Sequence, residues 1–265
     1  MKNKIYSFVL LIASYVVILN AQTTISGKRI QEKSIEATRV IGVEAVATMT
    51  ILDSKGDERV RRLAQISKLY DNGQTEKKLI RFLAPADVKG TGFLTFDYRE
   101  QDDDKWLYLP ALRKIRRIVS SENAKSFMGS EFSYADMTPP TVNDFTYNIL
   151  GEGIVNGVLC WELEILPKND DIADENGFSK KISYIGKQNY VIRKAIYYDL
   201  NEEIHKELTV YEIKELDNKK HTYRLMHIEM DNKQNGRKSI MKVDKIQFVP
   251  QLKEEYFTTR YLERE

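Results

Sequence analysis

The sequence predicts a mainly β protein in which a curved antiparallel sheet surrounds an apolar cavity. Alternation with a period of two recurs along the chain, as at Ala45–Leu52, and short polar turns such as Asp71-Asn72-Gly73 separate nearly all of these runs. Such alternation indicates strands, and turns this short join antiparallel neighbours. Several strands, such as Gly92–Tyr98, carry bulky residues on both faces. A sheet solvated on one side would alternate more cleanly, so these strands either fill a sandwich core or face a cavity.

Residues 1–21 are predicted to be a secretory signal peptide. Lys2 and Lys4 precede the apolar run Phe8–Leu19, which ends at the small residue Ala21. The run is too short for a spanning helix, which needs about 20 residues, although a retained N-terminal anchor is the alternative. No cysteine follows the run to carry a lipid anchor. We therefore expect an exported protein, soluble in the periplasm after signal cleavage.

The charge and length of the remaining chain indicate one balanced domain. The full sequence has 265 residues, with 41 basic and 39 acidic side chains. Removal of the signal takes away two lysines, so 41 − 2 = 39 basic side chains face 39 acidic ones. A balanced chain has no overall field to attract nucleic acid or an anionic membrane. No break in composition divides residues 22–265, which are expected to form a single domain with a sizeable core.

The expected elements begin with a helix, because apolar residues between Ser26 and Val40 fall roughly on one helical face. Strand-like runs then follow in order at 45–52, 62–70, 78–83, 92–98, 105–109, 114–119, 145–151, 158–166, 181–185, 192–199, 206–213, 222–229 and 239–248. The longest irregular stretch is Ser120–Asn143, around Pro139-Pro140. A compact domain usually keeps such a loop only when it covers or binds something.

No pattern of residues predicts catalysis, a metal centre or a cofactor. The closest histidines, His221 and His227, would lie about 20 Å apart along an extended strand, and His205 is farther away in sequence. Cys160 is the single cysteine and is interpreted as a buried small hydrophobe rather than a reactive thiol. Met128-Gly129-Ser130-Glu131 lacks the second glycine of a nucleophile elbow. We expect no enzyme; an envelope hydrolase is an alternative that would require a polar cleft.

Three parts of the chain resemble one known family. Residues 106–118 read WLYLPALRKIRRI, residues 126–137 contain SFMGS and FSYADM, and residues 255–263 read EYFTTRYLE. Over most of the chain, from about Glu44 to Glu265, the sequence resembles the outer-membrane lipoprotein-sorting protein family. The resemblance implies a LolA-like fold, an incomplete antiparallel barrel of about eleven strands with helices covering its open side. Members of this branch are often linked to exporters of the resistance-nodulation-division class.

The resemblance also implies a function: a periplasmic carrier that shields lipid or lipoprotein acyl chains in a hydrophobic cavity during transport toward the outer membrane. Shielding about ten methylenes at about 0.8 kcal/mol each recovers about 8 kcal/mol, a dissociation constant on the order of 1 μM. The expected cavity wall includes Met49, Phe82, Phe93, Phe96, Trp106 and Tyr108. The expected movable cover is Ser126–Met137, with Phe127, Met128, Gly129, Phe132 and Tyr134.

The basic segment Leu112–Ile118 has two interpretations. Arg113, Arg116 and Arg117 contact a lipid head group or a partner protein, or they form a solvated strand edge whose charge prevents aggregation. The expected partners are acyl chains, an inner-membrane exporter and an outer-membrane acceptor, with the protein itself a monomer. Nucleic acid is not an expected partner of an exported chain. The main alternative function is a structural or docking protein of an envelope transport complex, with a filled β core.

Overall fold

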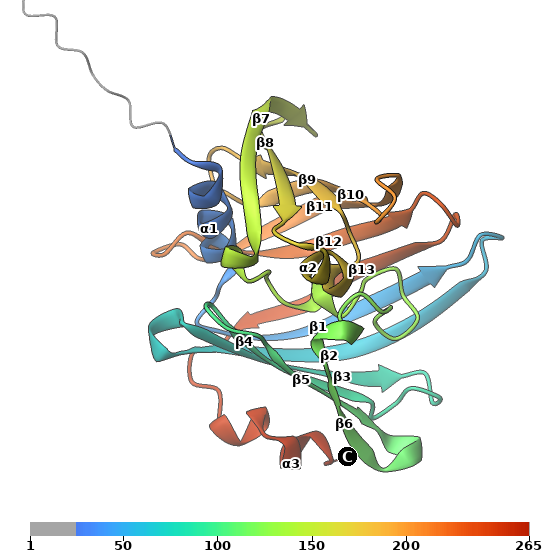
Figure 1. Cartoon of the computed structure of the whole chain (residues 1–265). Helices are drawn as coiled ribbons and strands as arrows, with labels where there is room; N and C mark the ends of the chain where they lie inside the picture. The colour runs from blue at the N-terminus through green and yellow to red at the C-terminus, as the bar shows by residue number, and fades with distance from the viewer. Residues whose placement is uncertain (1–24, 265) are drawn as a thin grey trace, which may run out of the picture.

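One open sheet of 13 antiparallel strands forms the fold in the computed structural model, which describes residues 25–264 (Figure 1). The predicted signal peptide lies outside the described residues. The strands are β1 (Gly42–Leu52), β2 (Glu58–Tyr70), β3 (Thr75–Ala84), β4 (Gly92–Tyr98), β5 (Asp104–Leu109), β6 (Lys114–Ile118), β7 (Phe145–Val155), β8 (Val158–Pro167), β9 (Lys180–Gly186), β10 (Ile192–Tyr198), β11 (Ile204–Asp217), β12 (Thr222–Asn232) and β13 (Lys238–Phe248). The α-helices are α1 (Gly27–Thr38), α2 (Asp170–Asn176) and α3 (Thr259–Leu262).

Every predicted strand segment corresponds to a strand of the structure, so the expected total of about eleven was too low. The predicted first helix is α1, where the Ser26 hydroxyl caps the first turn by accepting a hydrogen bond from the Arg29 N–H at 3.2 Å. The mainly β, antiparallel architecture is confirmed.

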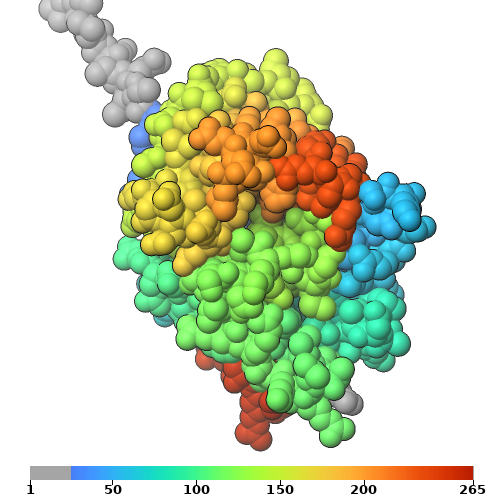
Figure 2. Space-filling view, turned by 45° about the vertical axis from the view of Figure 1, so that its right-hand side comes forward, coloured from blue at the N-terminus to red at the C-terminus, as the bar shows by residue number. Residues whose placement is uncertain are grey.

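The strand order explains why the sheet stays open. It runs β6-β5-β4-β3-β2-β1-β13-β12-β11-β10-β9-β8-β7, so two meanders are joined where β1 pairs with β13. The free edges, β6 and β7, are consecutive in the sequence, and the chain between them, residues 119–144, must pass from one edge to the other. In the space-filling view this connection, in green, occupies the middle of one face (Figure 2). We call residues 119–144 the connecting segment.

Strands β3 to β5 are buried on both faces. Adjacent residues Phe93 and Leu94 belong to different clusters: Phe93 packs toward the interior, and Leu94 packs against the residues that follow β13. Those C-terminal residues fold back over the outer face through Phe257 and Leu262, which are both buried. The Arg81 guanidinium holds them by donating to the carbonyls of Tyr261 and Leu262, at 3.0 and 3.2 Å. The bulky residues on both faces of these strands therefore have two separate partners.

Across residues 25–264, no helix has the length and apolar character needed to span a membrane.

Candidate functional site

A cavity of about 360 Å³ lies inside the curved sheet, between its two halves. This volume is within the range of about 300–1,000 Å³ that is typical of ligand pockets. Most of its wall is apolar and comes from α1, both halves of the sheet and the connecting segment. The apolar lining residues are Ile35, Val43, Ala45, Ala47, Leu63, Ile80, Phe132, Ala135, Met137, Pro139, Pro140, Phe145, Ile165, Phe178, Ile192, Leu208, Leu225, Ile228, Met230, Met241, Val243 and Ile246.

The connecting segment closes the cavity and is tied to both halves of the sheet. Its residues Phe132 and 135–140 line the cavity. From one half, the Lys78 ammonium on β3 donates to the Met137 carbonyl at 2.8 Å. From the other half, the Lys206 ammonium on β11 pairs with the Asp136 carboxylate at 2.7 Å, and both side chains are largely buried. Residues 136 and 137, the inner end of the segment, are therefore held to both halves of the sheet.

One end of the cavity contains a buried ion pair. Glu76 is almost fully buried and accepts a hydrogen bond from Arg224 at 3.1 Å, and the same Arg224 guanidinium also donates to the Ser67 hydroxyl at 2.9 Å. Burial alone would raise the pKa of Glu76, but Arg224 and Lys78 outweigh burial and hold it below its ordinary value. This carboxylate is therefore charged and neutralised.

Lys181, on β9, is a cation of the cavity lining that, among the residues the structure describes, has neither an ion pair nor the carbonyl acceptor that Lys78 has. Its ammonium lies 5.4 Å from the ring centre of Phe178 and 5.3 Å from that of Tyr197. Among residues 25–264 it makes no ion pair or side-chain hydrogen bond. Burial lowers the pKa of Lys181 to about 8, with Asp136 opposing this shift and Lys206 adding to it.

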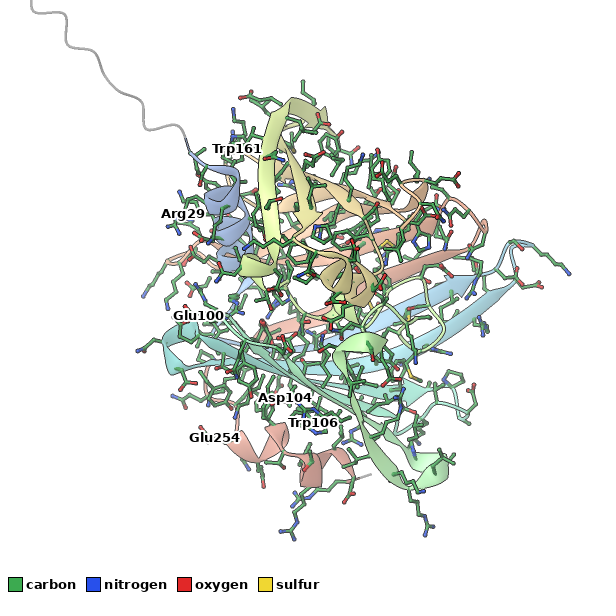
Figure 3. All side chains as sticks on the ribbon, viewed as in Figure 1. Arg29, Glu100, Asp104, Trp106, Trp161 and Glu254 are labelled. Atoms are coloured by element: carbon green, nitrogen blue, oxygen red, sulfur yellow. The ribbon has the colours of Figure 1, made fainter. Side chains whose placement is uncertain are left out.

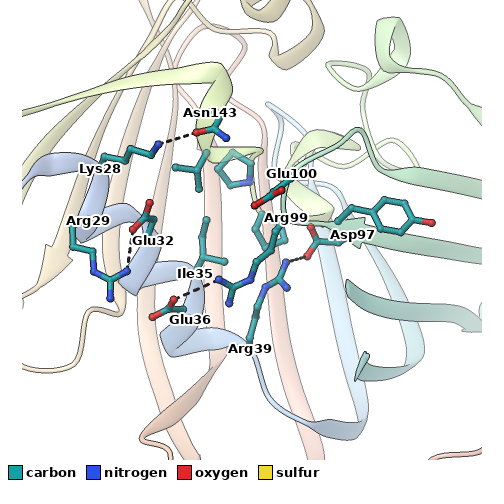
Figure 4. Close-up of a pocket in the computed structure, with 14 residues that line it drawn as sticks. Lys28, Arg29, Glu32, Ile35, Glu36, Arg39, Asp97, Arg99, Glu100 and Asn143 are labelled. Atoms are coloured by element: carbon teal, nitrogen blue, oxygen red, sulfur yellow. Dashed lines mark hydrogen bonds and ion pairs between the residues drawn. The ribbon is translucent and has the colours of Figure 1, made fainter. Parts of the chain in front are cut away.

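A second, charged crevice of about 320 Å³ lies beside the cavity, between α1 and the β4–β5 turn (Figure 4). It shares Ile35, Pro139 and Pro140 with the cavity, so these side chains separate the two spaces. Two exposed contacts and one buried ion pair cross it: Lys28 donates to Asn143 at 2.8 Å, Arg99 pairs with Glu36 at 3.5 Å, and the buried Arg39 at the end of α1 pairs with Asp97 on β4. Exposed contacts such as the first two contribute about 0–1 kcal/mol each, whereas breaking a buried pair such as Arg39–Asp97 costs about 3–5 kcal/mol.

The six residues predicted for the wall do not line this cavity. Met49, Phe82 and Phe93 are fully buried on the inner face, in a cluster next to it. The other three lie on the outer face, in the cluster under the C-terminal residues; they are Phe96, Trp106 and Tyr108. Trp106 is seen on that side in Figure 3. The strands were identified correctly, but period-two alternation does not tell which of two buried faces meets the cavity.

Of the five residues named for the cover, Phe132 lines the cavity. Phe127 and Tyr134 instead pack with Phe93, at ring-centre distances of 5.2 and 5.5 Å. Met128 and Gly129 form a tight turn with φ of 52° and 76°, a region that glycine adopts without strain. The part of the connecting segment that faces the cavity is thus farther along the chain, at 135–140.

The predicted arginine contacts lie on β6 and the turn before it, away from the cavity. Arg116 pairs with Glu122 at 3.0 Å, Arg117 pairs with Asp104, and Arg113 occupies the left-handed position of the turn. Elsewhere, the described residues include no group of three side chains placed to hold a metal ion.

Lys78, Lys181, Glu76 and Arg224 were not predicted from the sequence. The only signal available was a charged residue at an inward-facing strand position, such as Lys181 two residues before Ser183. That signal depends on knowing which face is inward.

The comparisons with known proteins agree with this architecture. A family model described as "Uncharacterized protein" matches residues 74–264. A protein of the DUF1329 family from Desulfovibrio piger is 28% identical, with a TM-score of 0.81 over 89% of this chain and 97% of that one. A domain from Vibrio parahaemolyticus that is assigned to outer membrane lipoprotein sorting is 29% identical, with a TM-score of 0.80 over 90% of this chain and 98% of that one.

A LolA superfamily protein from Nitrosomonas europaea shares the fold, with 17% identity and a TM-score of 0.66 over 89% of this chain and 99% of that one. No curated protein matches the sequence. The matched family model and the two structures above cover most of the chain and confirm the resemblance found in residues 106–137 and 255–263. The chain belongs to the family whose model matches residues 74–264, and it has a LolA-like fold.

Proposed function

We propose that this protein is a periplasmic carrier that shields the acyl chains of a lipid or lipoprotein in the cavity between α1, the connecting segment and the sheet. The observation that carries the proposal is an apolar cavity of about 360 Å³ inside an unclosed sheet. The family supports it, since the Vibrio parahaemolyticus relative is assigned to lipoprotein sorting. The predicted signal peptide supports the periplasmic location. We propose no catalytic activity.

The energetics suit a carrier. Each methylene moved out of water contributes about 0.8 kcal/mol, whether it enters a protein cavity or a bilayer. A chain bound in this cavity is therefore close in free energy to the same chain in a membrane, and partners set the direction of transfer. The partners that we propose are an inner-membrane exporter of the resistance-nodulation-division class and an outer-membrane acceptor.

We place the access route at the crevice of Figure 4, between α1 and residues 139–143. The contact between α1 and residues 139–143, from Lys28 to Asn143, is exposed and costs little to break, whereas the buried Arg39–Asp97 pair holds the C-terminal end of α1 to β4. The inner end is held by the buried Lys206–Asp136 pair, and breaking a buried pair costs about 3–5 kcal/mol. Movement of Pro139-Pro140 away from α1 is thus the route that we propose for entry of a chain.

The alternative, a docking protein with a filled β core, requires an interior without space for a ligand. The cavity weighs against it, and no specific contact of the exposed arginines favours it.

The test is to express the full chain in a Gram-negative host, purify the exported protein without detergent, and measure bound lipid by extraction and mass spectrometry. Ala45→Phe would fill the cavity from β1, while Val46→Phe, at the next position and on the other face, is the matched control. We expect stoichiometric acyl lipid in the wild-type protein and in Val46→Phe, and its loss in folded Ala45→Phe. Lipid-free wild-type protein, or equal lipid in Ala45→Phe, would contradict the proposal.

A further inference from the structure

The charges around the cavity do not balance. Its lining holds two carboxylates, Glu76 and Asp136, and three cations, Lys78, Lys181 and Arg224. Glu76 is neutralised by Arg224. The lining alone therefore has one more positive than negative charge.

The second carboxylate, Asp136, also has hydrogen-bonding partners already. Asp136 receives the Lys206 ammonium at 2.7 Å, the Ser133 hydroxyl at 2.9 Å and the Ser133 N–H at 2.8 Å on one oxygen, and the Tyr197 hydroxyl at 3.3 Å on the other. Lys206 lies behind the wall rather than in it. Asp136 thus stabilises the charge of Lys181 only by electrostatic attraction without a hydrogen bond, and Lys181 has no acidic partner of its own.

Lys181 shares its face of β9 with another unsatisfied group. Ser183, two residues along the strand, also lines the cavity, and within the described part of the chain its buried hydroxyl has no hydrogen-bond partner. Residues two apart on a strand lie about 7 Å apart on the same side. Buried cations and hydroxyls normally have partners, because leaving them unpaired is costly. Two neighbouring unpaired donors in a cavity are the arrangement expected around an anionic oxygen.

We propose that the cavity selects hydrophobic ligands with an anionic group, a carboxylate or phosphate on an acyl chain, and that Lys181 binds that group. The proposal rests on the carrier function above and adds the ligand class. The aromatic rings of Phe178 and Tyr197 flank the ammonium, and a hydrogen bond from an ammonium to an anionic oxygen is stronger in such weakly polar surroundings than in water. The acyl chain would lie along the apolar wall toward Leu63 and Val243.

The test uses protein stripped of lipid and the neutral fluorescent probe N-phenyl-1-naphthylamine, displaced by ligands with the same chain. These ligands are dodecanoate, dodecyl phosphate and uncharged dodecanol, with inorganic phosphate as the free anion. At pH 7 we expect the two anionic ligands to displace the probe at concentrations about tenfold below dodecanol, and inorganic phosphate to displace none.

In Lys181→Met the preference for the two anionic ligands over dodecanol should fall below about twofold, while the affinity for dodecanol stays unchanged. Lys181→Arg should keep the preference for the anionic ligands. Lys180→Met is the matched control, because Lys180 is the preceding residue and lies over Tyr198, outside the cavity lining. Equal displacement by dodecanoate and dodecanol in the wild-type protein would overturn this inference and leave the carrier function standing. Displacement by inorganic phosphate would overturn the amphiphile assignment. Failure of every chain to bind would overturn the carrier function as well.

Discussion

Replacing Lys181 by methionine is expected to stabilise the ligand-free protein. Burial lowers the pKa of this lysine from 10.5 to about 8. At about 1.36 kcal/mol per pKa unit, holding the ammonium in the folded state at pH 7 costs roughly 3 kcal/mol. Methionine keeps a side chain of similar size against Phe178 and Tyr197 without the charge. At about 2–4 °C per kcal/mol for a chain of this size, the thermal midpoint should rise by roughly 6–12 °C.

The effect has a defined pH dependence. Between about pH 8 and pH 10.5 the unfolded state binds more protons at Lys181 than the folded state does, so the wild-type protein gains stability as the pH rises through this window. Below about pH 8 the lysine is charged in both states and the full cost is present. The advantage of Lys181→Met should therefore be largest at pH 7 and shrink toward pH 10.5.

The assay is thermal unfolding, followed by circular dichroism, of lipid-stripped wild-type protein, Lys181→Met and Lys180→Met at pH 7.0 and 9.5. Groups that titrate in all three proteins cancel in the comparison. Lys180→Met should behave as the wild-type protein within about 0.5 kcal/mol. Destabilisation of Lys181→Met at pH 7, or a gain that does not change with pH, would refute the assignment of Lys181 as a buried, unpaired cation.

Two further predictions concern how the enclosure is held. Phe127→Ala should lower the free energy of unfolding by about 3–5 kcal/mol in urea denaturation, because Phe127 is fully buried against Phe82 and Phe93. A change below about 1 kcal/mol would mean that Phe127 does not hold this end of the connecting segment against the sheet. Gly27→Ala should lower the free energy of unfolding by about 1–3 kcal/mol, because the new Cβ would lie 2.6 Å from a carbonyl oxygen of β7. Gly151→Ala is the control and should leave the stability nearly unchanged, because a Cβ at Gly151 meets nothing within 4 Å. Equal stabilities of the two alanine variants would show that α1 does not pack this closely.

The strands could be located from the sequence because their signals are local. Alternation within a segment and a polar turn beside it depend on neighbouring residues only, and all the predicted segments are strands. The long irregular stretch was also informative, since a segment that joins the two free edges of an open sheet must cover the opening. The total of about eleven strands was taken from the resemblance, and it was too low.

The cavity lining could not be located in the same way, because it depends on contacts between distant parts of the chain. Phe96 and Trp106 have the composition of a cavity wall, but the C-terminal residues cover their face of the sheet. That cover comes from a segment some 150 residues away in sequence, so no pattern within β4 or β5 reveals it. Lys181 was overlooked for the opposite reason: a lysine in a strand is usually on a solvated face.

Asp136 offers a way to separate the two causes of the lowered pKa of Lys181. Burial would raise the pKa of Asp136, but Lys206 and the Ser133 donors outweigh burial and keep the carboxylate charged beside both lysines. Asp136→Asn should therefore destabilise the protein by about 3–5 kcal/mol, since it leaves two buried cations uncompensated. In that background Lys181→Met should stabilise more than in the wild-type protein, with a coupling of about 0.5–3 kcal/mol in a double-mutant cycle. If the two changes are additive, Asp136 does not compensate Lys181, and a bound anion would be the first counter-charge that this lysine meets.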